Sequence, residues 1–418
     1  MKAPRSIRRA LRTTTLLGAT ALLTVGGVTA CADDSSSSGT AEATGGASAA
    51  ALPSNPATGD PIKVGYITPE GGAITLPMVR EAGQAAADYL NNNGGGIGGH
   101  KVDLVVCKQQ EDPASATKCA NEMVEQKVAV VAAPFGGQGA VMVPIITGAG
   151  IPFVAQAPVS QVEMVTPSAS MLSGGIVAVL AGQAATAAKD GVKKLSIIIG
   201  DTGDAAASVK AVGDPMFKQA GVDLNVVAVP TSVADPTPQI TAGLADKPDA
   251  VTILGDTRQC ISSLKALQTV APTVKKYLIA TCLDKPVVEA VGPQTIAGAK
   301  AFTTVNLSAQ DPTVDLYKNV MATYAPDTDP AGIGYLGYQV IMSLGEVGKS
   351  LTGPVTPQTF AAALANAKNV PLPAAPGLTF TCNGTAVPAL KALCSKSILV
   401  SDIDANTKLE NTVVVNNS

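Results

Sequence analysis

Three loops of this chain combine glycine, amide and hydroxyl groups in a pattern that suits the binding of a small polar molecule. In Pro134-Phe135-Gly136-Gly137-Gln138, the glycines let a ligand approach bare backbone amides, and Gln138 adds a hydrogen-bonding side chain. Ala157-Pro158-Val159-Ser160 offers further amides and a hydroxyl, although Pro158 removes one donor. Gly71 lies in a third such loop, Thr68-Pro69-Glu70-Gly71-Gly72. Each loop is alternatively an ordinary turn without a binding role.

A second group of loops presents carboxylates. Asp201 and Asp204 enclose Thr202-Gly203, Asp256 follows Gly255, and Asp284 ends the segment Thr281-Cys282-Leu283-Asp284. An unpaired carboxylate can hold a ligand ammonium through charge-assisted hydrogen bonds. Aspartate is also common in loops and at helix N-termini, so capping of the next helix is the alternative for these positions.

The cysteines point to disulfide bonds rather than to a metal centre. Six of them follow Cys31 in three close couples: Cys107 and Cys119, Cys260 and Cys282, and Cys382 and Cys394. Six cysteines allow fifteen pairings, and the short separations within the couples favour sequential pairing. A metal site needs ligands at CxxC-like spacing, which is absent, and His100 is the only histidine. We therefore expect disulfides, no metal and no cofactor.

Hydrophobic patterning predicts the elements that position these loops. Short β-branched runs alternate with longer Ala-rich stretches, which implies parallel sheets covered by helices. The first series has strands at 62–67, 102–106, 128–132 and 152–154, with helices at 76–90 and 114–125. The second has helices at 176–189, 205–219, 240–244 and 261–269, with strands at 195–199, 222–227, 250–254 and 277–280. Helices at 314–324, 336–350 and 360–367 then precede strand-like runs at 378–381, 397–400 and 412–415.

Four predicted helices have a recognisable N-cap sequence. Asp112-Pro113, Asp235-Pro236, Asp311-Pro312 and Thr356-Pro357 each place a capping side chain before a proline at the first helical position. Tyr335 and Tyr338, three residues apart, lie on one face of a later helix, where we expect them to pack in the core.

The N-terminus has the three-part layout of an export signal. Five basic residues precede an uncharged apolar stretch at 16–28, which is shorter than the roughly 20 residues of a membrane span. Val28-Thr29-Ala30-Cys31 resembles a bacterial lipobox, which implies cleavage after residue 30 and a lipid on Cys31. An ordinary cleaved signal with an incidental cysteine is the alternative. Residues 31–60 are rich in Ser, Gly, Ala and Pro, so we expect a flexible tether there.

Charge narrows the range of partners. The full chain has a formal charge of −3, and loss of the five basic residues of 1–30, which contain no acidic residue, leaves −8. An acidic body disfavours nucleic acid and an electrostatic membrane patch.

Four segments resemble one family in their order and spacing. They are Lys63-Val64-Gly65-Tyr66-Ile67, the Gly-rich turn at 93–102, Glu111-Asp112-Pro113-Ala114 and Gly334-Tyr335-Leu336-Gly337-Tyr338. Over about residues 61–415 the chain resembles the type I periplasmic solute-binding family, of the leucine/isoleucine/valine-binding kind.

The resemblance implies two α/β lobes, each a doubly wound parallel sheet, joined by three chain crossings. Lobe 1 would comprise 61–172 and 304–373, and lobe 2 would comprise 173–303 and 374–418. In the family, positions in the loops at 134–138 and 157–160 hold the ligand carboxylate. Amino-acid binders also keep an acidic residue just after the strand at 277–280, where this chain has Cys282. Only Asp284 can substitute if Cys282 is bridged, which disfavours a standard α-amino acid.

The resemblance therefore implies a non-enzymatic receptor for an ABC importer. We expect a monomer, anchored outside the cell membrane by the lipid on Cys31, that presents a small solute to a membrane permease. The solute would be a polar molecule such as a branched-chain amino acid-like compound, an amide or an organic acid. A sensory lipoprotein of the same fold is one alternative, and an envelope enzyme is a more remote one.

Overall fold

The computed structural model describes residues 51–72, 74–201, 205–230 and 232–416. The predicted signal at 1–30, the lipidation site Cys31, most of the tether and Asp204 lie outside these residues. The last part of the expected tether is packed rather than free. Ala57 is buried and its amide donates to the carbonyl of Asn91 at 2.9 Å, while the Asn93 side chain donates to the carbonyl of Pro53 at 2.8 Å. The folded body therefore begins before residue 60.

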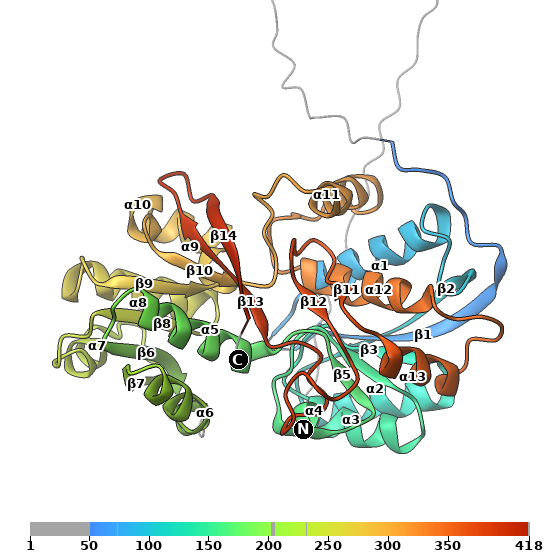
Figure 1. Cartoon of the computed structure of the whole chain (residues 1–418), viewed down its shortest axis with the longest axis horizontal. Coiled ribbons are helices and arrows are strands. Elements are labelled where there is room, and N and C mark those ends of the chain that lie inside the picture. The colour runs from blue at the N-terminus through green and yellow to red at the C-terminus, as the bar shows by residue number, and fades with distance from the viewer. Residues whose placement is uncertain (1–50, 73, 202–204, 231, 417–418) are drawn as a thin grey trace, which may run out of the picture. The chain divides into compact units, whose positions relative to one another are not determined.

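The first sheet contains five parallel strands in the order β2-β1-β3-β4-β5 (Figure 1). Its strands are β1 (Gly59–Pro69), β2 (His100–Gln109), β3 (Val130–Ala132), β4 (Phe153–Ala155) and β5 (Ala169–Met171). The helices between them are α1 (Pro77–Asn92), α2 (Pro113–Glu125), α3 (Gly139–Gly148) and α4 (Gln161–Val165). The strand order reverses next to β1, since β2 lies on one side of it and all later strands lie on the other.

Helices cover both faces of this sheet because alternate strand residues point to opposite sides. Val64 and Tyr66 of β1 belong to a core cluster shared with α1, whereas Ile67 belongs to a second cluster shared with α2 and α3. The hydroxyl of Tyr66 donates to the carbonyl of Val79 in α1 at 2.6 Å. Burial of these apolar side chains accounts for the continuous hydrophobic runs of the short strands.

The second sheet has seven strands in the order β14-β13-β10-β9-β8-β6-β7. Its strands are β6 (Lys194–Asp201), β7 (Asp223–Pro230), β8 (Ala250–Leu254), β9 (Lys275–Ile279), β10 (Lys300–Thr303), β13 (Ser397–Ile403) and β14 (Leu409–Asn416). The associated helices are α5 (Gly175–Lys189), α6 (Ala205–Gln219), α7 (Thr237–Gly243), α8 (Thr257–Val270), α9 (Lys285–Val291) and α10 (Pro293–Ile296), with a 3₁₀ turn at Ala280–Leu283. Ile198 and Ile197 of β6 face two different apolar clusters, so this sheet is also covered on both sides.

The remaining elements lie late in the chain. They are α11 (Pro312–Tyr324), α12 (Tyr335–Gly348), α13 (Pro357–Asn366) and the two-stranded sheet of β11 (Val370–Pro371) and β12 (Thr379–Phe380). Although distant in sequence, α12 packs closely on α1, where a Cβ on Gly337 would lie 2.0 Å from the carbonyl of Val79. Tyr335 and Tyr338 are buried in the same core cluster, as predicted.

The predicted α/β class with two parallel-dominated sheets is confirmed, with local differences. β13 and β14 join the second sheet antiparallel, so the strand-rich tail extends a parallel sheet at its edge. The caps Asp112, Asp311 and Thr356 are present, but α7 begins at Thr237, one residue later than Asp235-Pro236 predicts. Asp235 still accepts from the Thr237 amide at 3.0 Å.

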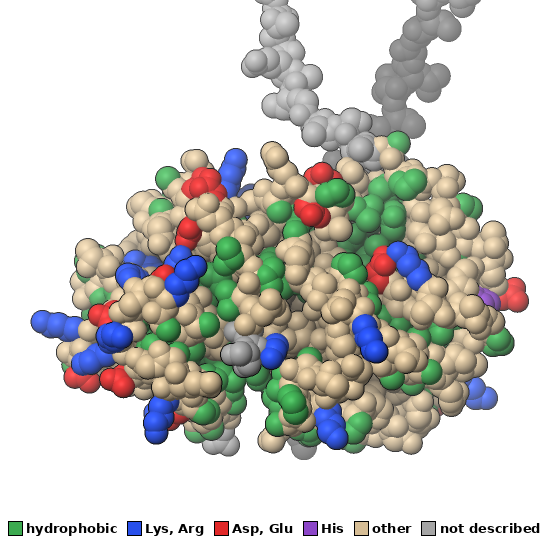
Figure 2. Space-filling model, in the orientation of Figure 1, with side chains coloured by type: hydrophobic (Ala, Val, Ile, Leu, Met, Phe, Trp, Pro, Cys, Tyr) green, Lys and Arg blue, Asp and Glu red, His purple; other side chains and the backbone are tan. Residues whose placement is uncertain are grey.

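All three predicted disulfides are present: Cys107–Cys119, Cys260–Cys282 and Cys382–Cys394. They join β2 to α2, α8 to the 3₁₀ turn at Ala280–Leu283, and the segment after β12 to the segment before β13. Over the described part of the chain, no helix is both long and apolar enough to cross a membrane. Acidic and basic side chains are interspersed over the face drawn in Figure 2, so charge on that face is mixed.

Candidate functional site

The loops predicted to bind a solute follow the carboxyl ends of strands in the first sheet. Gly71 follows β1, the segment 134–138 follows β3, and the segment 157–160 follows β4. Parallel strands bring these ends to one edge, where open α/β sheets bind ligands. The Gln156 amide donates to the carbonyl of Pro134 at 3.2 Å, so the loops after β3 and β4 are in contact.

The glycine-rich loop after β3 is occupied by a carboxylate of the chain itself. Gly137 donates its amide to Oε2 of Glu111 at 2.9 Å, and Gln109 donates to Oε1 at 2.6 Å. A Cβ on Gly137 would lie 2.9 Å from the same carboxylate. Glycine at this position therefore makes room for the Glu111 side chain, and its amide is not free to bind a ligand. Gln138 is the N-cap residue of α3, and its side chain donates to the backbone carbonyl of Glu111 at 3.2 Å. Phe135 packs against the core and Gly136 is buried.

The loop after β4 is occupied in the same way. Glu163 accepts hydrogen bonds at Oε2 from the Val159 amide at 2.9 Å, the Ser160 amide at 2.7 Å and the Ser160 hydroxyl at 2.9 Å. The Glu163 amide in turn donates to the Ser160 hydroxyl oxygen at 3.3 Å, which completes a capping box at the start of α4. Burial nevertheless raises the pKa of Glu163, and the charge of Glu111 adds to that rise. Ala157 is half-buried, Pro158 is buried, and Val159 exposes its side chain.

Loss of the Glu163 carboxylate is expected to destabilise this loop. In a Glu163→Ala variant, the Val159 and Ser160 amides lose their acceptor, and we expect the free energy of unfolding to fall by about 2 kcal/mol. Urea denaturation monitored by circular dichroism measures this free energy of unfolding. Glu125→Gln, which changes an exposed carboxylate at the end of α2, is the control and should leave the value within about 0.5 kcal/mol. An unchanged Glu163→Ala protein would contradict the capping role.

The loop after β1 is stabilised by ion pairs. Glu70 lies 2.8 Å from Arg80 and 2.6 Å from Lys108. Burial alone would raise the pKa of Glu70, but the hydrogen bonds from Lys108 and Arg80 outweigh it and lower that pKa. Gly71 is exposed with φ of 92°, and its amide donates to Oγ1 of Thr75 at 2.6 Å.

The three predicted aspartates of the second lobe that the structure describes have different surroundings. Asp201 ends β6 and is exposed, and Asp204 lies outside the described residues. Asp256 caps α8 by accepting from the Gln259 amide at 2.8 Å, which is the alternative expected for it. Asp284, by contrast, precedes α9 without forming a capping bond.

Of the predicted aspartates that the structure describes, Asp284 is the one that is partly buried. Desolvation, followed by the nearby charge of Asp329, raises the pKa of its carboxyl group to about 6. It takes part in none of the ion pairs found among the described residues. Asp284 also acts electrostatically on Tyr335 of α12, and burial raises the pKa of that tyrosine. An uncompensated, half-buried carboxylate beside a tyrosine hydroxyl can accept a cation or a hydrogen-bond donor.

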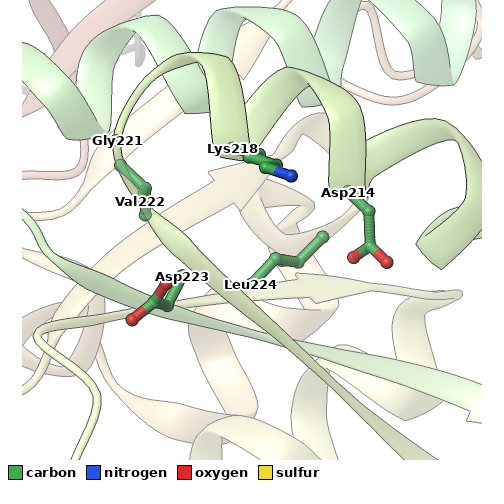
Figure 3. A pocket seen from close by; sticks show the side chains of 6 residues that line it. All are labelled: Asp214, Lys218, Gly221, Val222, Asp223 and Leu224. Carbon is green, nitrogen blue, oxygen red and sulfur yellow. The ribbon is translucent and has the colours of Figure 1, made fainter.

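Two surface cavities lie away from these loops. One of about 440 Å³ is lined by Asp214, Lys218, Gly221, Val222, Asp223 and Leu224, where α6 leads into the start of β7 (Figure 3). The other, of about 270 Å³, contains the 2.8 Å ion pair between Lys300 and Asp402 at the start of β10. The first lies at the amino end of β7, opposite the end where parallel sheets bind ligands, and the second lies mainly against the antiparallel strands β13 and β14. Within the described ranges, no three His, Cys, Asp or Glu side chains are placed to hold a metal.

Comparison with known proteins settles the family. The family model described as periplasmic binding protein matches residues 61–393. The chain belongs to this family. It is a family of solute-binding proteins rather than of enzymes. Curated protein sequences contain no match to the chain.

Solved structures show the same type I periplasmic binding fold. A leucine binding protein from Thermotoga maritima is 18% identical with a TM-score of 0.68, covering 85% of this chain and 99% of its own. A solute binding protein of an ABC transporter from R. palustris, in complex with 4-hydroxybenzoate, is 18% identical with a TM-score of 0.69 and coverage of 86% and 98%. A fatty acid ABC transporter substrate-binding protein from Thermomonospora curvata is 15% identical with a TM-score of 0.67 and coverage of 88% and 94%.

Sequence reasoning located the loops of this periplasmic binding protein but missed Glu111 and Glu163. Both carboxylates accept hydrogen bonds from backbone amides of the loops that were predicted to bind the solute. Ser160 and Glu163, three residues apart, are a capping-box signature that identifies Glu163 in advance. No comparable local signal identifies Glu111, because its partner Gly137 lies 26 residues away.

Proposed function

We propose that this chain captures a small organic solute for an ABC importer and is anchored outside the cell membrane by a lipid on Cys31. The family supports solute binding, and Val28-Thr29-Ala30-Cys31 supports the anchor. In this proposal, residues 61–172 and 304–373 form one lobe, and residues 173–303 and 374–418 form the other. The solute binds between the carboxyl ends of their strands, and closure of the lobes excludes water from it.

The observation that carries the proposal is the environment of Asp284. It follows β9 of the second sheet, and it interacts with Tyr335 at the start of α12, which packs with α1 against the first sheet. A half-buried carboxylate without a cation costs stability, which is typical of a group kept for a ligand. We therefore assign Asp284 to the amino group of the solute, with the loops after β1, β3 and β4 facing it.

The neighbouring structures support a small organic solute without identifying it. Their names refer to leucine, 4-hydroxybenzoate and fatty acid, so one fold accommodates solutes of different size and polarity. Identity below 20% to each of them leaves the solute of this chain to be decided by its own loops. Asp201 and Asp256 at the strand ends of the second sheet are further positions for contact with the solute.

Calorimetry and membrane fractionation test the proposal. Titration of the purified protein with amines, amino acids, amides and organic acids should show saturable binding, and mass spectrometry should recover the bound compound unchanged. Conversion of a bound compound into a product would instead indicate an enzyme. In cells, the protein should sediment with membranes and a Cys31→Ser variant should not, whereas Ser36→Ala in the same segment should behave as wild type. Membrane sedimentation of Cys31→Ser would contradict the lipid anchor.

A further inference from the structure

The backbone donors that would receive an anionic solute are already used inside the chain. Gly137 donates to Glu111, and Val159 and Ser160 both donate to Glu163. Glu163 is only 3% exposed, so its carboxylate is a fixed part of the loop. A solute carboxylate placed at either loop would have to displace the Glu111 or Glu163 carboxylate. The amides would then exchange one carboxylate acceptor for another and gain no hydrogen bond.

The charges of Glu111 and Glu163 add repulsion to this competition. The two carboxylates lie beside the same short segment, since a Cβ on Gly137 would lie 2.9 Å from Glu111 and a Cβ on Gly139 would clash with Glu163. Neither one belongs to an ion pair found in the described part of the chain. Charges in a partly buried site interact far more strongly than charges in bulk water. A second anion is therefore disfavoured here, whereas a cation is attracted.

The backbone of Glu111 shows how firmly its carboxylate is placed. Glu111 has φ of 59°, a left-handed conformation that is uncommon for residues other than glycine and costs free energy. The conformation is maintained by hydrogen bonds from Gln109 and Gly137 to its side chain and from Gln138 to its carbonyl.

A buried acceptor between the same loops also lacks a donor. Gln156 is 1% exposed and directly precedes Ala157, and its Oε1 atom has no hydrogen-bond partner. Its Nε2 atom donates to Gln339 at 2.9 Å and to Thr304 at 3.1 Å, which defines the orientation of the amide. A buried carbonyl oxygen without a partner calls for an N–H or O–H group. Thr304 lies near Tyr335, on which Asp284 also acts electrostatically, so Gln156 and Asp284 approach the same part of α12.

We propose that the solute is a protonated amine or guanidine that carries no carboxylate, with its N–H groups received by oxygens of Glu111, Gln156 and Asp284. This inference rests on the proposed function, because it assigns the solute class of the same site. It departs from a zwitterionic α-amino acid, since only the positive half of such a molecule finds a complementary group in these loops.

Matched compounds test the proposal on the unmodified full chain. Each set contains an amine, the amino acid that yields it on decarboxylation, and the acid without the amino group: isopentylamine, leucine and 4-methylpentanoate; tyramine, tyrosine and 3-(4-hydroxyphenyl)propanoate; agmatine, arginine and 4-guanidinobutanoate. At equal concentration, we expect at least one amine to raise the melting temperature by about 2 °C or more, and its two counterparts to leave it unchanged.

The other outcomes separate this inference from the proposed function. A rise with an amino acid or an acid that equals or exceeds the rise with its amine would overturn the cationic class while upholding a solute receptor. A panel without any effect in any class would count against both.

A variant then tests the role of Glu111 with the amine that binds best. Glu111→Gln removes the charge but keeps the shape, and we expect the affinity to fall about 10-fold. Glu125→Gln, an exposed position on the adjacent helix α2, should bind as wild type does. Unchanged affinity in Glu111→Gln would overturn its assignment as a cation acceptor. Because the comparison of compounds needs no variant, poor folding of Glu111→Gln would leave the main test intact.

Discussion

An Asp284→Asn variant is expected to bind an amine solute about 30-fold more weakly and yet to be more stable than the wild type. Affinity falls because the amide cannot neutralise a cation. Stability rises at pH 7 because the cost of holding a half-buried charge disappears. The pKa of Asp284 rises from 3.8 to about 6, which corresponds to an upper limit of about 3 kcal/mol, and partial exposure reduces the expected gain to about 1 kcal/mol.

The pH dependence follows from the direction of the shift. Between about pH 4 and pH 6 the folded protein binds more protons at Asp284 than the unfolded chain does, so this group makes stability fall as pH rises through that range. Above about pH 6 the full cost is present. Affinity for an amine should change in the opposite sense and weaken below about pH 6, as Asp284 becomes protonated.

Calorimetry and thermal unfolding at matched pH values measure both effects. Glu289→Gln on the same helix α9 is the control. The Glu289 carboxylate is exposed, and its ion pair with Lys285 is long, at 3.9 Å. We expect this control to change neither affinity nor stability by more than about 0.5 kcal/mol. Asp284→Asn protein that binds amines as tightly as the wild type would refute the assignment of Asp284 to the solute.

Removal of the Cys260–Cys282 disulfide is expected to lower the free energy of unfolding by about 3 kcal/mol. The bridge closes a loop of 22 residues and both cysteines are fully buried, so Cys260→Ser with Cys282→Ser also buries two hydroxyl groups. The bridge ties α8 to the turn before Asp284, where Thr281 donates to the Gly255 carbonyl at 2.9 Å. Affinity for the solute should therefore fall together with stability.

A second disulfide separates the local effect from general destabilisation. Replacing Cys382 and Cys394 by serine removes a bridge of sequence separation 12, and we expect a somewhat smaller loss of stability with affinity within about twofold of wild type. Guanidinium denaturation and calorimetry on both double variants make the comparison. Equal losses of affinity in the two variants would mean that Cys260–Cys282 has no specific part in positioning Asp284.

Local signals predicted the helices and strands well where capping or turn residues bounded a hydrophobic run. The ranges 205–219 and 250–254 coincide with α6 and β8, and Asp112, Asp311 and Thr356 cap their helices. Elements without such signals were missed. β10 (Lys300–Thr303) has four residues and is defined by pairing with β9 and β13 on its two sides, which no local pattern reveals.

The loops of the site were predicted more completely than their contents. A glycine-rich loop after a short strand is visible in the sequence, and 134–138 does follow β3 as expected. What fills the loop depends on a side chain 26 residues earlier that is turned back by its own backbone conformation. In our proposal, this difference changes the chemistry of the loop from anion binding to cation binding.

Taken alone, the amino-acid sequence determined the α/β class and favoured the sequential pairing of the six later cysteines. It also predicts an export signal with a lipidated cysteine. Those features arise from contacts between near neighbours or from the periodicity of apolar residues, so they are encoded locally. Tertiary structure alone decided which amides are free and which carboxylates lack a partner. The surroundings of Glu111, Glu163 and Asp284 include groups far along the chain, and burial raises the pKa of Glu163 and Asp284. Neither the burial nor these contacts exist before the chain has folded.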